Sequence, residues 1–383
     1  MLKTLRLKNF TVFASAELLF CAGLNVIVGQ NGTGKTHLLK AGYLMNRAWP
    51  DLMFKRTALN RKRAEAYFED RLLGLFQPVS LDHLIRRGSR GGSHVRADVE
   101  AFIPTLSILT EAERTQTLAQ FPFDSMTETL HWGVDIKSAK DLSLAQTNIP
   151  LDASAVPDTA AVNAYVPKSL FIPSKEIVSM YEGLIALLDR YEIKLDATYG
   201  DLARSMNSPE LTLVPALLPG VMAELEHELG GRMTLDAGRL SFVGSDGIRT
   251  EGPLMAEGFR KLATLMYLIR RGALAEKGET LFWDEPETNL NPVYIRWVAT
   301  ALIWLANAGV QVILATHSLF LLREFEVLAE QDGAEGAPQR YFALMRGKKG
   351  VTVSAGDNIE SVNPLVLLDE DLAQSDRFIG TLK

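Results

Sequence analysis

A glycine-rich motif near the N-terminus constrains this chain more than any other feature of its sequence. The motif fits the pattern G-x-x-x-x-G-K-[ST] at every fixed position. Its residues are Gly29, Gln30, Asn31, Gly32, Thr33, Gly34, Lys35 and Thr36. The apolar run 23–28 predicts a buried strand before the motif, and 37–45 predicts a helix after it. In that setting, backbone amides and the helix N-terminus face a polyphosphate. We expect Lys35 to reach the β and γ phosphates, Thr36 to ligate Mg²⁺ and His37 to border the same site.

Two further apolar runs each lead into polar residues suited to nucleotide chemistry. The run 280–283 precedes Asp284 and Glu285. A carboxylate at a strand end can hold Mg²⁺, which suits Asp284, and a second one can orient a water for attack on the γ-phosphate, which suits Glu285. The run 310–315 precedes His317, which we expect to hydrogen-bond the γ-phosphate at the same sheet edge. The predicted catalytic residues are Glu285, Lys35 and His317, and the predicted metal ligands are Thr36 and Asp284.

At these residues the chain resembles ABC-type ATPases of the SMC, RecF and OLD (overcoming lysogenisation defect) kind. Four other segments carry the likeness: a strand ending in Asn-Phe, the start of a signature helix, a D-loop and a switch histidine. They are residues 5–10, 256–262, 286–292 and 316–318. The resemblance covers about 1–43 and 254–318, and the middle of the chain carries little specific match.

The resemblance implies an α/β fold with a mixed central sheet, an antiparallel β subdomain and an inserted helical lobe. It also implies ATP and Mg²⁺ as cofactors and a head-to-tail dimer or higher oligomer, with each P-loop opposed by the signature segment of the other subunit. Glu257, Gly258 and Asn289 would join the nucleotide site. Ala256 occupies the position of the usual signature serine, so one hydroxyl contact to the γ-phosphate is missing and dimer closure is weakened.

The motifs divide the chain into four segments. A first ATPase segment spans 1–47, and a second spans 251–383 with the signature, the Asp-Glu strand, the D-loop, the switch histidine and two strands within 339–353. Between them we expect an insertion at 48–163 and a helical lobe with a hairpin at 164–250. Within these, we expect helices near 55–75, 175–191 and 214–229, strands at 94–102, 128–137 and 169–174, a loop at 141–157 and a hairpin at 232–250.

Composition agrees with a soluble, cytoplasmic protein. At 383 residues and 47% hydrophobic, the chain can bury one large core or two smaller ones. Cys21 is the only cysteine, which excludes an intrachain disulfide framework. Basic residues interrupt the N-terminal region, so we expect no signal segment. The apolar stretch 297–315 approaches the length of a membrane span. However, 307–309 divides it into a helix and a strand, so we expect no membrane contact.

Positive charge gathers in one region although the net charge is −6. Residues 53–96 contain ten Lys or Arg and four Asp or Glu, whereas acidic residues exceed basic ones elsewhere. The clusters consist of Lys55, Arg56, Arg61, Lys62, Arg63, Arg86 and Arg87. Such a region is typical of a surface that contacts DNA or RNA phosphates. A solvated helix face and a docking site for a protein partner remain alternatives.

The sequence also indicates what this chain lacks. No heptad pattern persists between the two ATPase segments, so we expect no long coiled-coil arms. Only 66 residues follow His317, too few for the Toprim nuclease of many OLD-type proteins. The family's Q-loop has two candidate positions, Gln77 and the pair Lys175-Glu176, and the second is favoured slightly. A nuclease under the control of this chain would be a separate effector chain.

The favoured function is an Mg²⁺-dependent ATPase whose ATP-driven dimerisation gates a process linked to nucleic acid. The resemblance implies bacterial anti-phage defence or DNA maintenance. Three alternatives stay open: a nucleotide-stabilised assembly scaffold with slow turnover, a transporter nucleotide-binding subunit and a P-loop phosphotransferase. Ala256 favours the scaffold, whereas the lack of a Leu-Ser-Gly-Gly-Gln signature argues against the transporter subunit.

Overall fold

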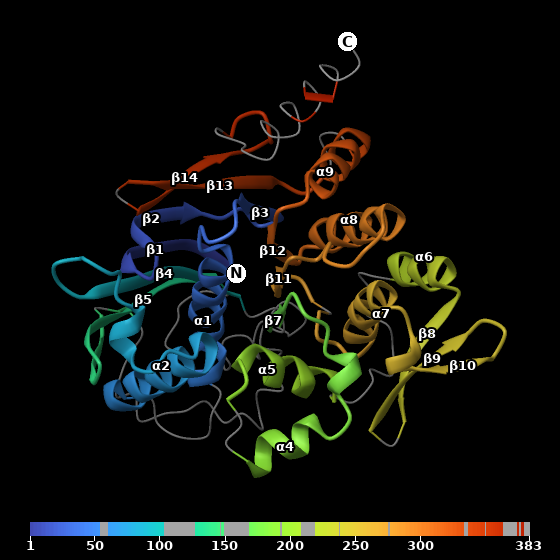
Figure 1. Ribbon diagram of the computed structural model, residues 1–383, viewed down its shortest axis with the longest axis horizontal. Helices are drawn as coiled ribbons and strands as arrows, with labels where there is room; N and C mark the ends of the chain where they lie inside the picture. Colours follow the sequence, from blue (N-terminus) through green and yellow to red (C-terminus); the bar gives the residue numbers. More distant parts are fainter. Residues whose placement is uncertain are drawn as a thin grey trace, which may run out of the picture.

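Three β-sheets and the helices around them make up the computed structural model (Figure 1). The structure describes residues 1–53, 60–102, 127–145, 147–148, 168–191, 194–207, 219–236, 238–274, 276–332, 336–348, 350–362, 374 and 377–378. Lys55 and Arg56, two of the basic residues singled out in the sequence, lie outside this described part.

A six-stranded sheet forms the centre of the molecule, in the order β14-β13-β3-β12-β11-β7. The strands are β3 (Leu24–Gly29), β7 (Ser169–Ile172), β11 (Thr280–Asp284), β12 (Gln311–Thr316), β13 (Gln339–Gly347) and β14 (Gly350–Gly356). The strands β13, β3, β12, β11 and β7 run parallel to one another, whereas β14 is antiparallel to β13. The sheet is therefore mixed, as predicted. Every residue of β3, β11 and β12 is buried, which explains their continuous apolar runs.

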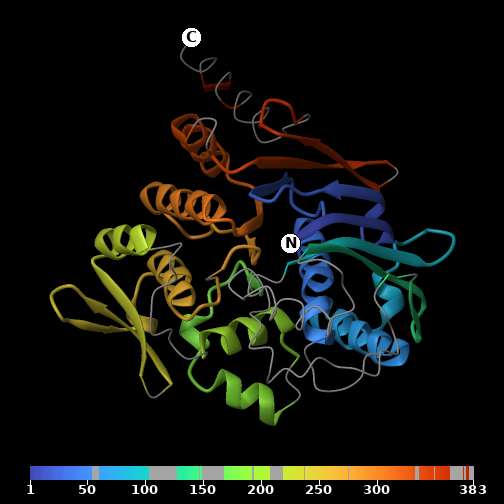
Figure 2. The ribbon, with the colours of Figure 1, turned by 180° about the vertical axis from the view of Figure 1, so that it is seen from behind.

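Helices cover both faces of this sheet (Figures 1 and 2). Alternate strand residues enter two separate cores, so Phe282 packs with α1 (Lys35–Met53) on one face. Its neighbour Trp283 packs on the opposite face. The helices of that face are α7 (Glu257–Arg270), α8 (Pro292–Asn307) and α9 (Leu319–Asp332). The predicted division of 297–315 into a helix and a strand is confirmed by α8 and β12.

A second, five-stranded sheet is antiparallel and lies on the α1 side. Its order is β2-β1-β4-β5-β6, from β1 (Leu2–Phe10), β2 (Phe13–Leu19), β4 (Ser93–Phe102), β5 (Thr127–Ser138) and β6 (Asp141–Leu144). The helix α2 (Arg61–Phe76) packs in the same core. The expectation of a loop at 141–144 is wrong, because Leu142 and Leu144 pair with Ile136 and Val134 of the neighbouring strand.

A lobe of short elements lies between the two predicted ATPase segments in sequence. It comprises η3 (Val178–Met180), α4 (Leu184–Arg190), α5 (Ala197–Met206), α6 (Pro219–Leu229), β8 (Gly231–Asp236), β9 (Arg239–Gly244), β10 (Arg249–Glu251) and η4 (Gly252–Leu254). A further short helix, η1 (Leu81–Leu84), precedes β4. The expected helix at 175–191 is divided, because Gly183 has a left-handed φ of 77° before α4. The expected hairpin at 232–250 is instead a three-stranded sheet, and α5 was not predicted.

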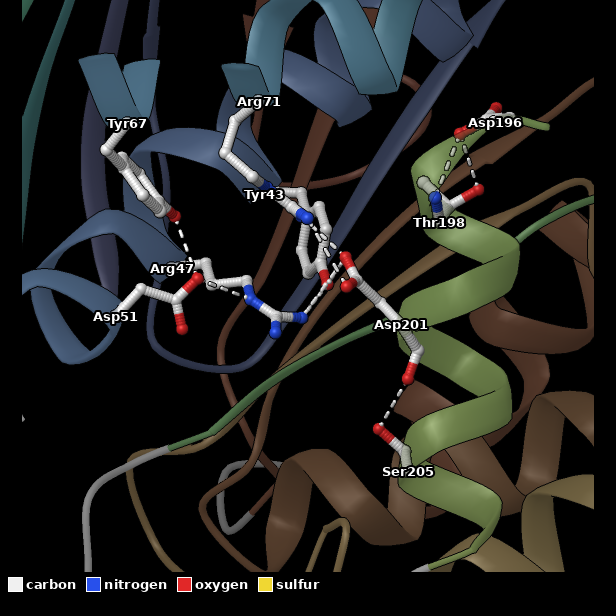
Figure 3. A network of polar contacts seen from close by, with 9 residues as sticks. All are labelled: Tyr43, Arg47, Asp51, Tyr67, Arg71, Asp196, Thr198, Asp201 and Ser205. Atoms are coloured by element: carbon white, nitrogen blue, oxygen red, sulfur yellow. Dashed lines mark hydrogen bonds and ion pairs between the residues drawn. The ribbon is translucent and has the colours of Figure 1, made fainter. Parts of the chain in front are cut away.

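A buried polar network holds α5 against α1 and α2 (Figure 3). The Tyr43 hydroxyl on α1 donates to the Asp201 carboxylate on α5 at 2.9 Å. Arg47 of α1 and Arg71 of α2 pair with the same carboxylate at 3.2 and 2.5 Å. Asp201 therefore has three donors around it, and the lobe is attached directly to the helix that follows the P-loop.

Among the described residues, no helix is long and apolar enough to cross a membrane.

Candidate functional site

The P-loop connects β3 to α1, as the sequence predicts. Gly34 has a φ of 89°, and a Cβ there would lie 2.6 Å from the Val12 side chain, so both conformation and space require glycine. The Lys35 ammonium is buried and donates to the carbonyl oxygen of Gly29 at 2.7 Å and of Gln30 at 3.3 Å. Burial lowers its pKa, while nearby carboxylates, Glu285 first among them, oppose that shift. This cation lies where a bound phosphate can replace its backbone partners.

Thr36 and Asp284 meet although 248 positions separate them. The Thr36 hydroxyl donates to Asp284 Oδ2 at 2.8 Å, while Oδ1 is buried without a hydrogen-bond partner within the described residues. Burial, opposed by the Thr36 bond and aided by Glu285, raises the pKa of Asp284 to about 6. Oxygen ligands of this kind suit Mg²⁺, which keeps several waters and takes few protein ligands. The orphaned Oδ1 therefore fits the predicted metal site.

Glu285 and His317 lie side by side just beyond the ends of β11 and β12. The His317 Nδ1 atom is 3.4 Å from Glu285 Oε1 and 3.6 Å from Glu287 Oε1. Glu287 is buried and accepts hydrogen bonds from the Thr316 hydroxyl at 2.7 Å and the His317 amide at 3.0 Å. Glu287 thus fixes the backbone that carries the histidine. Glu285 has a left-handed φ of 49°, an uncommon conformation for a residue with a side chain.

The first turn of α7 packs on the segment that follows Glu285. The Asn289 side-chain amide donates to Glu257 Oε1 at 2.7 Å. A Cβ on Gly258 would lie 2.8 Å from the Asn289 carbonyl oxygen, so glycine permits this close approach. Ala256 is the N-cap of α7 and makes no side-chain capping bond. The free backbone amides of this helix start remain available to an anion.

A cavity of about 650 Å³ opens beside the P-loop. Gly32 and His37 line one part of it, and the His37 ring makes an edge-on contact with Phe76, with ring centroids 5.6 Å apart. Burial lowers the pKa of His37, and its Nδ1 atom has no partner within the described residues. Four cationic side chains also line this cavity: Arg86, Arg87, Arg346 and Lys348.

Comparisons with known proteins agree with this geometry. Residues 227–323 match the family described as "AAA domain, putative AbiEii toxin, Type IV TA system", and residues 4–41 match one described as "AAA domain". A Rad50 DNA double-strand break repair ATPase of Thermoplasma volcanium is 31% identical over 100 residues, which are 26% of this chain and 11% of that protein. The DNA replication and repair protein RecF of Shewanella baltica is 33% identical over 134 residues. That alignment covers 33% of this chain and 35% of RecF.

Solved structures show the same fold over nearly the whole chain. An SMC head bound to the C-terminal winged-helix domain of ScpA has a TM-score of 0.53 at 15% identity and covers 94% of this chain and 98% of its own. An SMC head with an extended coiled coil, bound to the C-terminal domain of ScpA derived from Pyrococcus furiosus, has a TM-score of 0.51 at 13% identity. It covers 98% of this chain and 99% of its own.

In sequence and fold the chain is similar to ABC-type P-loop ATPases of the SMC and RecF group. It spans about a tenth to a third of the length of these curated relatives.

The loop after β7 lies at the edge of the sheet that carries the predicted metal ligands. Ile172 is opposite Trp283 in the parallel register, so the chain leaves β7 at the same end of the sheet as Asp284. The fold thus favours Lys175-Glu176 over Gln77, which instead ends α2 in a left-handed conformation. Glu176 also forms a buried ion pair with Arg260 of α7, at 3.0 Å.

The basic residues predicted as one surface lie in different surroundings. Arg61 donates to the Leu144 carbonyl oxygen at 2.8 Å, and Arg63 donates to that of Leu52 at 3.2 Å. Lys62 is exposed between them. Arg86 and Arg87 instead line the cavity beside the P-loop. Two of the predicted phosphate-binding residues are thus also used to join elements of the fold.

Several residues of the candidate site have no individual role in the sequence prediction. Glu287 was visible only as part of the D-loop pattern. Arg346 and Lys348 reach the cavity from the β13–β14 hairpin, more than 300 positions after the P-loop. Lys261 belongs to the predicted start of the signature helix without a role of its own, yet it is buried beside Glu285. No local pattern could reveal these contacts, because the fold alone brings the residues together.

Proposed function

We propose that this chain binds and hydrolyses ATP with Mg²⁺ and that ATP drives its head-to-tail dimerisation. The observation that supports this most is the 2.8 Å bond between Thr36 and Asp284, with Glu285 and His317 beside them. Those four side chains and Lys35 come from three neighbouring parallel strand ends. Residues at this edge can together bind a polyphosphate and position a water.

Each side chain has a distinct role in the proposed reaction. Lys35 leaves its backbone partners and binds the β and γ phosphates, and Thr36 and Asp284 hold Mg²⁺. When bound, Mg²⁺ supplies positive charge that stabilises the phosphates during transfer. Glu285 orients a water and takes its proton as the water oxygen bonds to the γ-phosphorus. The bond from the γ-phosphorus to the bridging oxygen breaks, leaving ADP and phosphate. His317 donates to the γ-phosphate and thereby senses its presence.

The cavity beside the P-loop would take the nucleoside part of ATP. It begins at Gly32 and His37, next to the predicted phosphate site, and its volume of about 650 Å³ is within the range of small-molecule pockets. Phe76 and the His37 ring offer an aromatic wall to a base. The cationic side chains around it would attract the phosphates at longer range.

In the proposed dimer, the amides at the start of α7 face the γ-phosphate held by the other subunit. Asn289 and Glu257 form part of the same face because they are bonded to each other. The missing hydroxyl at Ala256 leaves only backbone donors there. This observation favours slow turnover, so a nucleotide-stabilised scaffold is the second candidate function.

The biological setting is part of the same proposal. The Rad50 and RecF relatives carry DNA repair in their names, which supports a cytoplasmic process linked to nucleic acid. We propose anti-phage defence or DNA maintenance with a separate effector chain. The basic residues near α2 and at the cavity would supply the contact with DNA or RNA.

The first test compares ATP turnover of the wild type and of Glu285→Gln. We expect kcat to fall at least about 100-fold, which is typical for loss of a general base. ATP binding should be retained, and ATP should trap a larger species on size-exclusion chromatography. Glu182→Gln is the control, because Glu182 is an exposed partner of Arg239. Equal turnover in wild type and Glu285→Gln would contradict the mechanism, and negligible turnover in both with ATP-dependent assembly would support the scaffold.

A second test addresses nucleic acid. If double-stranded DNA stimulates turnover, Lys62→Glu should reduce that stimulation, whereas Lys137→Glu on β5 should not. Lys62 is preferred to its neighbours because Arg61 and Arg63 also bond to the backbone of other elements. Stimulation that survives in Lys62→Glu would exclude a DNA contact at the start of α2.

A further inference from the structure

A buried lysine on α7 contacts the turn that carries the proposed catalytic carboxylate. Lys261 is 4% exposed, and its ammonium donates to the backbone carbonyl oxygen of Glu285 at 3.4 Å. The same oxygen accepts the Thr288 amide at 3.2 Å, which closes the turn after β11. Lys261 therefore holds the backbone of Glu285 from the side of the sheet on which α7 lies.

This contact matters because the conformation of Glu285 is one that its residue type rarely adopts. A left-handed φ at a residue with a side chain is strained and persists only when the surroundings impose it. Here the Glu285 amide donates to the Ala315 carbonyl oxygen at 2.9 Å, while its own carbonyl faces Thr288 and Lys261. The result is a carboxylate directed toward His317 rather than along the strand.

The lysine also balances negative charge at this edge of the sheet. Burial lowers the pKa of the Lys261 ammonium, and four nearby carboxylates raise it: those of Glu287, Glu257, Glu285 and Asp284. Glu287 is itself buried, with one carboxylate oxygen that has no partner within the described residues. Replacing the cation would leave these acids less compensated.

Lys261 is one of three residues by which a single face of α7 docks on this turn. Glu257 accepts from Asn289, and Gly258 lies against Leu290, while Lys261 follows one turn later on the same face. A displacement of the start of α7 would thus reach Glu285 through a direct contact. Arg260, the neighbouring residue, ties the same turn of the helix to Glu176 in the loop after β7.

We propose that Lys261 is a positioning residue that couples helix α7 to the placement of the Glu285 carboxylate. This inference rests on the proposed function, in which Glu285 acts on the attacking water. It assigns α7 a second task beside its N-terminal amides: contacts made at the helix start would change the rate of hydrolysis through Lys261.

The test is Lys261→Met, which keeps the length of the side chain and removes its donors. We expect kcat to fall about 10- to 100-fold, since displacement of a catalytic group by 1 Å can cost that much. The dissociation constant for ATP should change less than about threefold, because Lys261 does not contact the P-loop in the proposed site. Lys261→Arg, which keeps a charged donor, should recover part of the lost rate.

The matched control is Lys168→Met. Lys168 also donates to a backbone carbonyl, that of Gly272 at 2.9 Å, but it is more exposed than Lys261 and precedes β7 at the opposite end of the sheet. Its loss should leave kcat within about twofold. In a Glu285→Gln background, Lys261→Met should change the single-turnover rate less than about threefold, because both substitutions act on the same step.

Hydrogen exchange of the segment from Glu285 to Leu290 provides a readout that needs no turnover. It should be faster in Lys261→Met than in wild type and in Lys168→Met. An unchanged kcat, a rate loss that adds to that of Glu285→Gln, or unchanged exchange would overturn the role of Lys261. If the wild type does not hydrolyse ATP, the proposed function fails, and the exchange rates alone decide whether Lys261 holds this turn.

Discussion

Two buried aspartates on the α1 side of the molecule differ in how their charge is satisfied. Asp201 is 6% exposed and Asp284 is 5% exposed. Burial raises the pKa of Asp201, but Arg47 and Arg71 outweigh it and hold that pKa below its ordinary value. Burial also raises the pKa of Asp284, and there it prevails, to about 6. The first aspartate is neutralised by the protein, and the second is left incompletely compensated.

This contrast separates a structural site from a functional one. The network around Asp201 joins three helices and leaves the carboxylate with three donors (Figure 3). The Asp284 carboxylate has one donor, Thr36, and an oxygen without a partner within the described residues. A buried charge without partners is costly, so a protein retains it where a ligand completes the site. The predictions below test that distinction.

The largest change in the free energy of unfolding is expected from Asp201→Asn. The substitution leaves Arg47 and Arg71, both partly buried, without their shared carboxylate, although Arg47 keeps its pair with Asp51. Breaking a buried pair typically costs about 3–5 kcal/mol. We therefore expect the free energy of unfolding at pH 7 to fall by about that amount, measured by denaturant titration. A loss below about 1 kcal/mol would mean that the network contributes little to stability.

Asp357→Asn serves as the control, because Asp357 is 78% exposed in its pair with Arg340. Such surface pairs are worth about 0–1 kcal/mol. The pH dependence adds a second check. Since the folded-state pKa of Asp201 is lowered, its stabilisation is present above the unfolded value of 3.8 and is lost as the pH falls through the folded value. The difference between wild type and Asp201→Asn should therefore shrink in acid.

A smaller change, an increase in the free energy of unfolding rather than a loss, is expected from Asp284→Asn. Its folded pKa of about 6 lies above the ordinary value of 3.8, so the folded state binds an extra proton between these values. Stability therefore falls as the pH rises through this range and stays lower above it. Without Mg²⁺ and nucleotide, we expect Asp284→Asn to be more stable than wild type at pH 7 by up to about 2 kcal/mol.

Thermal unfolding at pH 4, 5, 6 and 7 measures this difference, which should nearly vanish at pH 4. The Asn variant should also lose Mg²⁺-dependent ATP binding, because a charged metal ligand is gone. A variant that is less stable than wild type at pH 7 would show that Asp284 is compensated in the same way as Asp201. The two aspartates would then no longer differ.

The smallest effect is expected from Tyr43→Phe. The substitution removes one hydrogen bond donated to Asp201 and one accepted from Arg47, and it leaves both arginines in place. A hydrogen bond to a charged group contributes about 1.5–3 kcal/mol, and we expect a loss near the lower end of that range in the free energy of unfolding, because both arginines still pair with Asp201. Because Tyr43 does not contact the proposed nucleotide site, the dissociation constant for ATP should stay within about twofold. A larger change in ATP binding would show that the network around Asp201 influences the P-loop.

The sequence predicted the central sheet and its motifs well. The strands before Gly29, Asp284 and His317 are buried on both faces, so their apolar runs are continuous and easy to recognise. The two C-terminal strands around Gly347 were also predicted, since a glycine-bounded turn is a local signal. Elements outside the sheet were harder to predict from the sequence. The short helix α5 is capped by Asp196, whose side chain accepts a hydrogen bond from the Thr198 amide. With only ten residues, its apolar periodicity is too short to be recognised in the sequence.

The sequence by itself determined that Lys35, Thr36, Asp284, Glu285 and His317 follow strands and that a nucleotide is the expected ligand. These are properties of short segments, set by glycine conformation and by strand ends. Only the tertiary structure decided which charges face each other. It brought Thr36 to Asp284, Lys261 to Glu285, and both arginines to Asp201. The reason is physical: whether a buried charge is compensated depends on neighbours that are distant in sequence, and burial itself exists only after folding.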